Sequence, residues 1–279
     1  MVLKQTTIKK INEFVKTEPR TVQEVSCYLG KNWRTADSYL KKISDELGTI
    51  SMKVFRKGTR GALKIAYWNN LDTPNNNNAQ EQLFRRIETG QKITDFSPFD
   101  IYQYIGENKR ASFFEKQGEE IINIKQDLVG SLRKAQKHIL IFSGSISWSN
   151  IEQEDVKLIE VFEELAEKGI SINFIANINI MSINNAKKMN AINNKIGKDR
   201  VSIRHFEQPL RAFIVDDKFI KLKEIKNPKD INKKNKMYIF YEIYDKEWIK
   251  WMEKVFFTFF SVAIPFKKRI KDLKTIKKI

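Results

Sequence analysis

The sequence predicts a two-domain α/β protein, in which a small helical module with a basic β-hairpin precedes a larger domain of alternating strands and helices. Three patterns support this prediction. First, residues 21–48 show two helical periodicities, each ended by a glycine. Second, strand-like runs at 50–56 and 62–68 flank a basic tip. Third, strand and helix patterns alternate after residue 138. The length of 279 residues, 41% of them hydrophobic, is enough for two ordinary cores.

The N-terminal module begins with three predicted helices. A first amphipathic helix is expected over residues 4–15. Thr21 is suited to cap the second helix, and Gly30 to end it because glycine adopts the left-handed backbone of a helix exit without steric penalty. The third helix shows cations and hydroxyls on its outer side, and Gly48 stops it. Its buried stripe recurs at i, i+4, i+7 and i+11, at Ala36, Leu40, Ile43 and Leu47.

The two runs after the third helix flank residues 57–61, a glycine-bracketed basic tip that suits a hairpin. Three helices and a basic hairpin follow the order of a winged helix-turn-helix, which we assign to residues 1–70. In that arrangement the start of the last helix reaches base edges, and cations on the helix and hairpin contact phosphates. The expected DNA-binding residues are Lys31, Asn32, Arg34, Thr35, Ser38, Lys41, Lys42, Arg56, Lys57 and Arg60.

The location of the charge favours a polyanionic partner. The formal net charge is +17; residues 1–70 hold 14 Lys and Arg against 6 Asp and Glu, and residues 265–279 hold 7 against 1. Residues 71–264 keep only +3. The positive field therefore lies at the two ends, where it would steer DNA toward the module. An alternative stays open for the basic C-terminal tail, 265–279, where lysine can simply fill solvated faces.

Several classes of protein receive no support from the sequence. The single cysteine, Cys27, excludes an intrachain disulfide, and two histidines with one cysteine argue against a zinc site. No glycine-rich phosphate motif joins a strand to a helix, so no cofactor is expected. The N-terminus lacks a signal-peptide hydrophobic region, and the longest apolar stretch is shorter than the roughly 20 residues that span a bilayer. We therefore expect a cytoplasmic protein without a membrane partner.

The connection between the two domains has two expected parts. Residues 71–80 form a polar linker with an asparagine run, and residues 81–137 form a helical connector. Within the connector, residues 119–137 predict a longer helix with a narrow apolar stripe. That stripe would face the next domain or a twin helix.

The larger domain is expected over residues 138–264, with a mostly parallel mixed sheet. A strand, a helix and a second strand form a βαβ unit, and its right-handed crossover makes the two strands parallel. Asp245 is suited to cap the last helix. Strands are expected at 138–143, 170–178, 201–205, on either side of Asp216 and at 237–243, and helices at 156–168, 183–196 and from 246 onward.

Three segments, HILIFSGSISW, ISINFIANI and PLRAFIVDDKFIKL, resemble one half of the phospholipase D-like fold, whose signature is HxKxxxxD. The resemblance implies a histidine that attacks phosphorus, a lysine that binds phosphate and an aspartate that supports the site. Aligned on Asp216, the motif has Pro209 in place of the histidine and Arg211 in place of the lysine. Proline cannot be a nucleophile, whereas arginine can hold an anion, so we expect binding without cleavage and no enzyme.

Small hydroxylated residues follow the first strand of this domain at its carboxyl end, the edge where open α/β sheets bind ligands. They could hydrogen-bond a phosphate or a sugar, although a tight strand-to-helix connection would need the same small residues. A small anionic or sugar effector is the expected ligand. The candidate ligand-binding residues are Ser143, Ser145, Arg211 and Asp216.

A winged helix joined to a phospholipase D-like domain without its histidine is similar to archaeal transcription regulators, including the sugar-responsive kind. The resemblance implies a sequence-specific DNA-binding regulator whose second domain senses an effector or mediates assembly. We expect double-stranded DNA as a partner and a homodimer, because regulators usually read paired half-sites. Two alternatives stay open: a phosphodiesterase or nuclease with a relocated nucleophile such as His205, and an adaptor whose winged helix binds protein.

Overall fold

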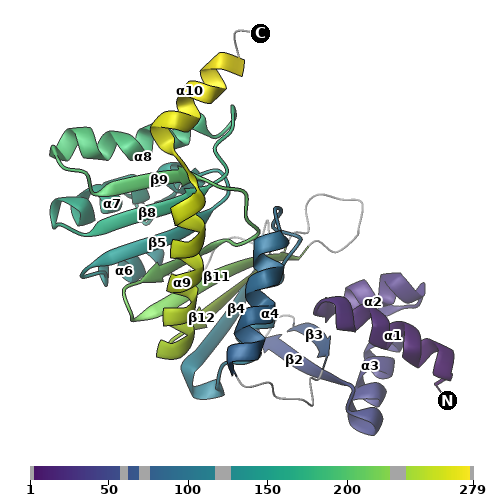
Figure 1. Ribbon diagram of the computed structural model, residues 1–279. Helices are drawn as coiled ribbons and strands as arrows, with labels where there is room; N and C mark the ends of the chain where they lie inside the picture. The colour runs from purple at the N-terminus through teal and green to yellow at the C-terminus, as the bar shows by residue number, and fades with distance from the viewer. Residues whose placement is uncertain (1–2, 57–61, 69–75, 117–126, 227–236, 277–279) are drawn as a thin grey trace.

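The computed structural model describes residues 3–56, 62–68, 76–116, 127–226 and 237–276. Within these ranges, a three-stranded antiparallel sheet belongs to the N-terminal module, and an eight-stranded mixed sheet organises the larger domain. Figure 1 shows the N-terminal helices at one end of the molecule and the C-terminal helix α10 at the other. None of the described helices is long and apolar enough to cross a bilayer.

The N-terminal module consists of three helices and three short strands. Its apolar side chains, Ile11, Val25 and Leu40 among them, form a core of their own. The strands pair in the order β1-β3-β2. The elements are α1 (Gln5–Thr17), β1 (Arg20–Thr21), α2 (Val22–Leu29), α3 (Trp33–Leu47), β2 (Ile50–Arg56) and β3 (Ala62–Trp68).

Local capping fixes the turn between α2 and α3. Thr21 and Glu24 form a reciprocal capping box at the start of α2. Gly30 ends α2 at φ +59°, a left-handed conformation that costs glycine nothing. Asn32 then caps α3, its side chain accepting the Thr35 N–H at 2.8 Å. The turn therefore holds the start of α3 in one orientation.

The large sheet has the strand order β13-β9-β8-β5-β10-β11-β12-β4. The sheet is mixed, as expected, but among the described strands only β5, β8 and β9 pair in parallel. Consecutive antiparallel strands dominate the other half because short connections join only antiparallel neighbours. The bounds are β4 (Arg110–Lys116), β5 (His138–Ser143), β8 (Ser171–Ala176), β9 (Val201–His205), β10 (Ala212–Val215), β11 (Phe219–Lys226), β12 (Met237–Ile243) and β13 (Ile264–Pro265).

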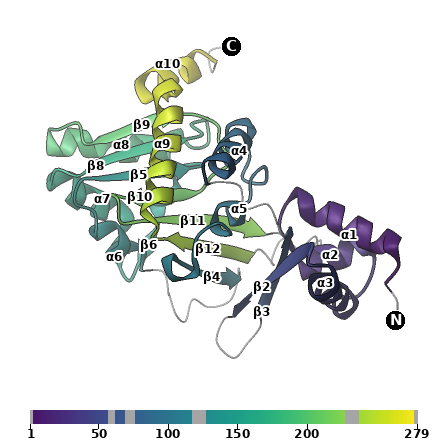
Figure 2. The ribbon, with the colours of Figure 1, turned by 60° about the horizontal axis from the view of Figure 1, so that its bottom comes forward.

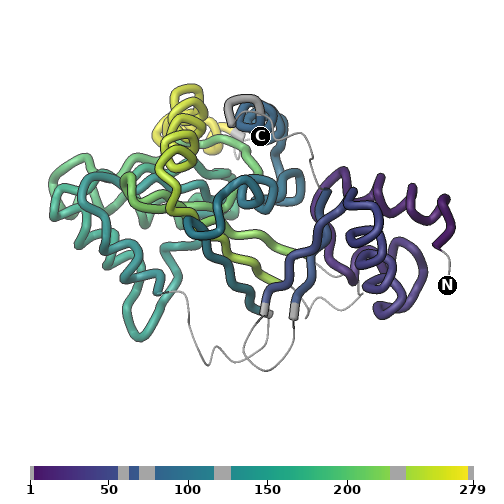
Figure 3. The backbone as a smooth tube through the Cα atoms, turned by 90° about the horizontal axis from the view of Figure 1, so that it is seen from below, coloured from purple at the N-terminus to yellow at the C-terminus, as the bar shows by residue number. Residues whose placement is uncertain are grey.

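Helices cover both faces of this sheet and give it two cores. One core unites β-strand side chains with α9 and α4, and the other unites the opposite face with α6, α7, α8 and α10. Figure 3 shows α9, in yellow, along one side of the sheet. The helices are α4 (Asn76–Thr89), α5 (Phe99–Tyr102), α6 (Leu128–Arg133), α7 (Leu158–Glu167), α8 (Ile183–Ile196), α9 (Lys246–Val262) and α10 (Phe266–Ile276). Short pieces complete the chain: η1 (Glu107–Lys109), η2 (Ser147–Asn150), β6 (Glu152–Gln153) and β7 (Val156–Lys157).

The segment expected as a linker and helical connector is built differently. The helix α4 starts at Asn76, inside the range 71–80. Residues 110–116, expected to be helical, form the edge strand β4, which pairs with β12 along its whole length. The rings of Phe113 and Phe240 stack across this pair at 5.0 Å, so the strand gains its stability from a distant partner. The helix expected over 119–137 is described only from residue 127, where α6 is six residues long.

The β2–β3 hairpin joins the N-terminal module to the larger domain. On one side Ile50 and Ala66 belong to the core of the module, while on the other Phe55, Leu63 and Ile65 belong to a core of the large sheet. Phe55 meets the ring of Tyr241 on β12 edge to face at 6.4 Å. Figure 2 shows the hairpin between the N-terminal helices and β12. The two parts therefore share apolar surface.

The tail expected to be a basic steering segment is also partly structural. Residues 266–276 form α10, and Leu273 is buried in the core beneath α7 and α8. Arg269 donates from Nε to the carbonyl of Ile178 at 2.9 Å. At least one of its cations is thus engaged in holding the end of β8.

Candidate functional site

The outer surface of α3 carries most of the expected DNA-binding residues that the structure describes. Lys31, Arg34, Ser38 and Lys41 are exposed, and Thr35 and Lys42 are half-buried. On the opposite stripe, Ala36, Leu40 and Ile43 are buried against α1 and α2, whereas Leu47, which was expected to be buried with them, is exposed at the end of the helix. The helix therefore presents cations and hydroxyls to solvent on one side.

Two of the expected contacts have partners within the module. The side-chain oxygen of Asn32 accepts the Thr35 N–H, so this residue first serves as a helix cap. Lys42 lies 3.5 Å from Glu46, one turn further along the helix. Such an exposed i,i+4 pair is worth little and leaves the cation accessible.

The one carboxylate in the middle of α3 is neutralised from the hairpin. Lys64 on β3 donates to both oxygens of Asp37, at 2.7 and 2.8 Å, and Lys41 lies 3.5 Å from the same carboxylate. Lys64 also stands 5.1 Å above the ring of Trp33. Two cations therefore surround one buried acid, and the surface keeps a positive excess.

The remaining expected contacts fall on the hairpin tip. Lys57 and Arg60 lie outside the described residues, as does the side chain of Arg56. They stay predictions.

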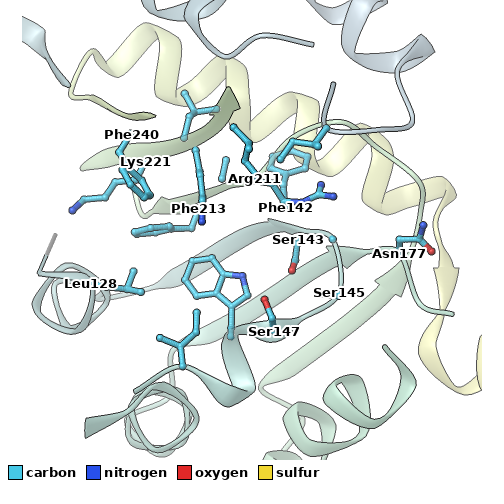
Figure 4. A pocket seen from close by; sticks show the side chains of 18 of the residues that line it. Leu128, Phe142, Ser143, Ser145, Ser147, Asn177, Arg211, Phe213, Lys221 and Phe240 are labelled. Atoms are coloured by element: carbon cyan, nitrogen blue, oxygen red, sulfur yellow. The ribbon is translucent and has the colours of Figure 1, made fainter. Parts of the chain in front are cut away.

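A second candidate site is a cavity of about 600 Å³ on the large sheet, at the carboxyl ends of β5 and β8. In Figure 4, Ser143, Ser145, Ser147 and Asn177 lie toward one side and Leu128, Phe213 and Phe240 toward the other. One end of the cavity therefore carries hydroxyl and amide groups, and the other carries aromatic and aliphatic side chains together with Lys221. The cavity lies at the carboxyl edge where the sequence places the candidate ligand-binding residues, and ligand binding there stays a prediction.

The serine loop after β5 is held by its own hydrogen bonds. The Ser143 hydroxyl accepts the N–H of Ile146 at 3.1 Å, and Ile146 is left-handed at φ +53°. The Ser145 carbonyl accepts from Asn185 on α8 at 3.0 Å. Ser143 is buried and Ser145 exposed. The loop thus has the structural role that the sequence left open, and it also lines the cavity.

Arg211 lies at the same end of the cavity. One terminal nitrogen donates to the carbonyl of Leu210 at 2.7 Å. The guanidinium lies against the backbone of Gly144, where an added Cβ would come within 2.6 Å of the other terminal nitrogen. Burial lowers the pKa of Arg211. Within the described part of the chain, no carboxylate lies within 4.0 Å of Arg211.

Two lysines of β11 line the same cavity. Lys221 is buried and paired with Glu242 at 2.7 Å. Lys223 lies 4.2 Å above the ring of Tyr238 and 5.6 Å from that of Phe240. Burial lowers the pKa of Lys223, an effect that Glu115 opposes. The position of these lysines could not be predicted from the sequence, because the pairing of β11 with β10, which places them here, has no local signal.

Asp216 belongs to the opposite end of β10 and does not line the cavity, in contrast to the expectation from the motif. Its carboxylate accepts the N–H groups of Gln136, Lys137 and His138 at 2.7, 2.9 and 2.8 Å. Burial would raise the pKa of Asp216, but these three bonds outweigh it and the pKa is lowered. The residue fixes the entry into β5.

His205, the candidate relocated nucleophile, is held inside the end of β9. Its Nδ1 accepts the N–H of Ile178 at 3.0 Å, and it does not line the cavity. Burial lowers its pKa, and the nearby Arg269 adds to that effect. Pro209, at the motif's histidine position, packs against Gly90, where an added Cβ would be 2.8 Å from its ring.

A buried polar network lies where the N-terminal module meets the large sheet. Glu224 on β11 accepts from Ser97 at 2.6 Å and from the Tyr241 hydroxyl at 2.5 Å. Lys226 pairs with Glu224 at 3.2 Å and donates to the carbonyl of Pro19 at 2.9 Å. Asp100, nearby, is buried. The signal for this network in the sequence is the strand β11, in which four charged residues interrupt apolar positions: Lys221, Lys223, Glu224 and Lys226.

Comparison with known proteins gives only distant likenesses. No protein-family model matches the chain, and no curated protein matches it. Similar solved structures include TrmBL2, an archaeal chromatin protein, at 14% identity over 94% of each chain with a TM-score of 0.38. They also include Nuc, a phospholipase D family member from Salmonella typhimurium, at 12% identity over 56% of this chain and 98% of that one, with a TM-score of 0.39. NucT from Helicobacter pylori is 12% identical over 56% and 99%, with a TM-score of 0.41. These values are too low to support any statement about function.

Proposed function

We propose that the protein is a DNA-binding transcription regulator that docks α3 in the major groove of double-stranded DNA, as a winged helix does. The observation that carries this proposal is an exposed, positively charged surface formed by Lys31, in the turn before α3, and by Arg34 and Lys41 on α3. Its only buried acid, within the described part of this helix, is already neutralised by Lys64. Phosphate attraction is the main source of affinity for DNA, and such a surface supplies it.

The positions along α3 suggest a division of roles. Arg34 and Ser38 lie one helical turn apart on the exposed side, where their side chains reach base edges. Lys31 and Lys41 lie at the start of the motif and further along the helix, where they contact phosphates. The capped N-terminus of α3 adds a partial positive charge that favours the same polyanion.

We also propose that the larger domain binds a ligand without cleaving it and that the protein acts as a homodimer. Support for binding without cleavage comes from Pro209 at the motif's histidine position and from His205, which is occupied by the backbone of Ile178. A homodimer is proposed because two symmetric modules would read paired half-sites.

Fluorescence anisotropy with labelled duplexes at several salt concentrations tests DNA binding. If Lys31 and Lys41 each contact a phosphate, replacing both by Gln reduces the slope of log K against log salt by about 1.8, since each contact contributes about 0.9. The matched control is Lys250→Gln with Lys254→Gln on α9, which removes the same charge from exposed positions elsewhere.

Arg34→Gln tests base recognition separately. We expect it to weaken binding to a selected duplex by about 10- to 100-fold and binding to a random duplex far less, because a lost bidentate base contact costs about 1–3 kcal/mol. Equal slopes for the double variant and its control, together with unchanged selectivity in Arg34→Gln, would exclude α3 as the DNA-binding element.

A further inference from the structure

We propose that the cavity at the carboxyl ends of β5 and β8 binds an organic anion with a flat apolar ring, its charged head on Arg211 and its ring against Phe213. The assignment rests on the proposed ligand binding by the larger domain and does not depend on DNA binding. It narrows the ligand to a chemical class with two parts, each set by a different end of the cavity.

The head-group end is organised by a cation whose hydrogen bonds are incomplete. Arg211 has five N–H donors, and among the described residues its guanidinium donates from one terminal nitrogen to the carbonyls of Leu210 and Gln208, at 2.7 and 3.4 Å. The other terminal nitrogen and Nε lie against Gly144 beside the cavity. A half-buried guanidinium without a carboxylate gains most from an anion that completes its hydrogen bonds.

Polar groups of the neighbouring loops surround that end. Ser143, Ser147 and Asn177 line the cavity, as does Gly144, against which the Arg211 guanidinium lies. Hydroxyl and amide groups can donate to the oxygens of a phosphate or a carboxylate. The guanidinium fork matches both heads in geometry, so the two heads are separate arms of the test.

The charge balance of the cavity favours an anion over a neutral sugar. Its charged lining residues are Arg211, Lys221 and Lys223 against Glu115 alone. The Glu242 carboxylate neutralises Lys221, which leaves one cation in excess. Lys223 is joined to Arg211 through the backbone, because its backbone N–H donates to the Arg211 carbonyl at 2.7 Å, while its ammonium lies 5.6 Å from the ring of Phe240. A low-dielectric concave site concentrates this field.

The opposite end of the cavity supplies aromatic surface. Trp148 meets Phe213 edge to face at 5.6 Å, and Phe240 is braced from behind by its stack with Phe113 at 5.0 Å. Rigid rings at fixed angles accept a flat ring with little loss of conformational entropy. A volume of about 600 Å³ is far more than a bare phosphate fills and is typical of sites for organic ligands.

Isothermal titration of the intact protein distinguishes the two parts of the ligand. The probes are phenyl phosphate, benzoate, inorganic phosphate and phenol. We expect phenyl phosphate or benzoate to bind at least about tenfold more tightly than both phosphate and phenol, and the better of the two identifies the head. Absence of binding by both aromatic anions, or phenol binding as tightly as they do, would overturn the proposal.

Variants locate the binding in this cavity. Arg211→Gln removes a charged donor and is expected to weaken the better anion by about 10- to 100-fold. Gly144→Ala is expected to act similarly because its methyl group would displace the guanidinium. Lys250→Gln, exposed on α9, is the control and leaves the affinity unchanged.

Circular dichroism and thermal unfolding check that each variant is folded. If Arg211→Gln or Gly144→Ala does not fold, Lys223→Gln replaces it, with an expected loss of at least about threefold. Folded variants that bind the anion as tightly as the control would refute the assignment of this cavity. No DNA is present in these titrations. A failure here therefore says nothing about the role of α3, which is tested by the anisotropy experiment.

Discussion

Replacing Asp100 by asparagine is expected to change how stability depends on pH. Asp100 is buried and accepts from Arg86 at 2.6 Å. Burial raises its pKa from 3.8 to about 6; Arg86 opposes the rise, and the charge of Glu224 adds to it. The attraction of Arg86 is therefore weaker than the free-energy cost of removing water from the ionised carboxylate.

The sign follows from where the proton is bound. Between pH 4 and 6 the unfolded chain has lost the Asp100 proton, whereas the folded chain still holds it, so a rising pH favours unfolding. The stabilisation from Asp100 is fully present below its unfolded pKa of 3.8 and is lost as pH rises through about 6. A difference of about 2 pH units corresponds to about 3 kcal/mol.

Urea unfolding of wild type and Asp100→Asn at half-unit steps from pH 4 to 7.5 measures this. We expect wild type to lose about 3 kcal/mol relative to the variant across pH 4–6, and the difference to be constant above about pH 7. Asp199→Asn, at an exposed position, is the control and should give a flat difference. A flat difference for Asp100→Asn too would refute the reasoning.

Three further substitutions test how the structure is held together, each measured by urea or thermal unfolding. Asp216→Ala leaves three partly buried backbone N–H groups without their acceptor and should cost about 1–3 kcal/mol; a loss below about 0.5 kcal/mol would contradict its role. Phe55→Ala should cost about 3–5 kcal/mol, whereas Val54→Ala, at an exposed neighbouring position, should cost under about 1; similar costs would argue against a shared core. Lys226→Met leaves Glu224 without its cation and should lower the free energy of unfolding by about 3–5 kcal/mol. It should also speed hydrogen exchange in β1, because the hydrogen bond to the carbonyl of Pro19 is lost; unchanged exchange there would contradict this role of Lys226.

The N-terminal module was predictable because its signals are local. Thr21, Gly30 and Gly48 lie at helix ends, as predicted, since caps and left-handed exits depend on the residue itself and its near neighbours. The strand β4 was not predictable in this way. Its residues become a strand because β12 offers them a complete row of partners, including the stack of Phe113 on Phe240.

The candidate cavity was predictable in part for the same reason. Ser143, Ser145 and Arg211 line it as expected, because a strand end and a recognisable motif place them at one edge. Asp216 lies at the other end of a four-residue strand, a distance that the motif spacing does not reveal. Lys223 joins the cavity through antiparallel pairing across the sheet, which has no local signal.

The alternation of side chains along β11 has a mechanical consequence. Lys223 borders the cavity, while its immediate neighbour Glu224 points the other way, into the network that ends on the carbonyl of Pro19. A single peptide bond thus separates a residue that lines the cavity from a residue of the network that holds the N-terminal module. A ligand that displaced β11 at Lys223 would therefore also displace Glu224, and with it the hydrogen bond of Lys226 to the carbonyl of Pro19.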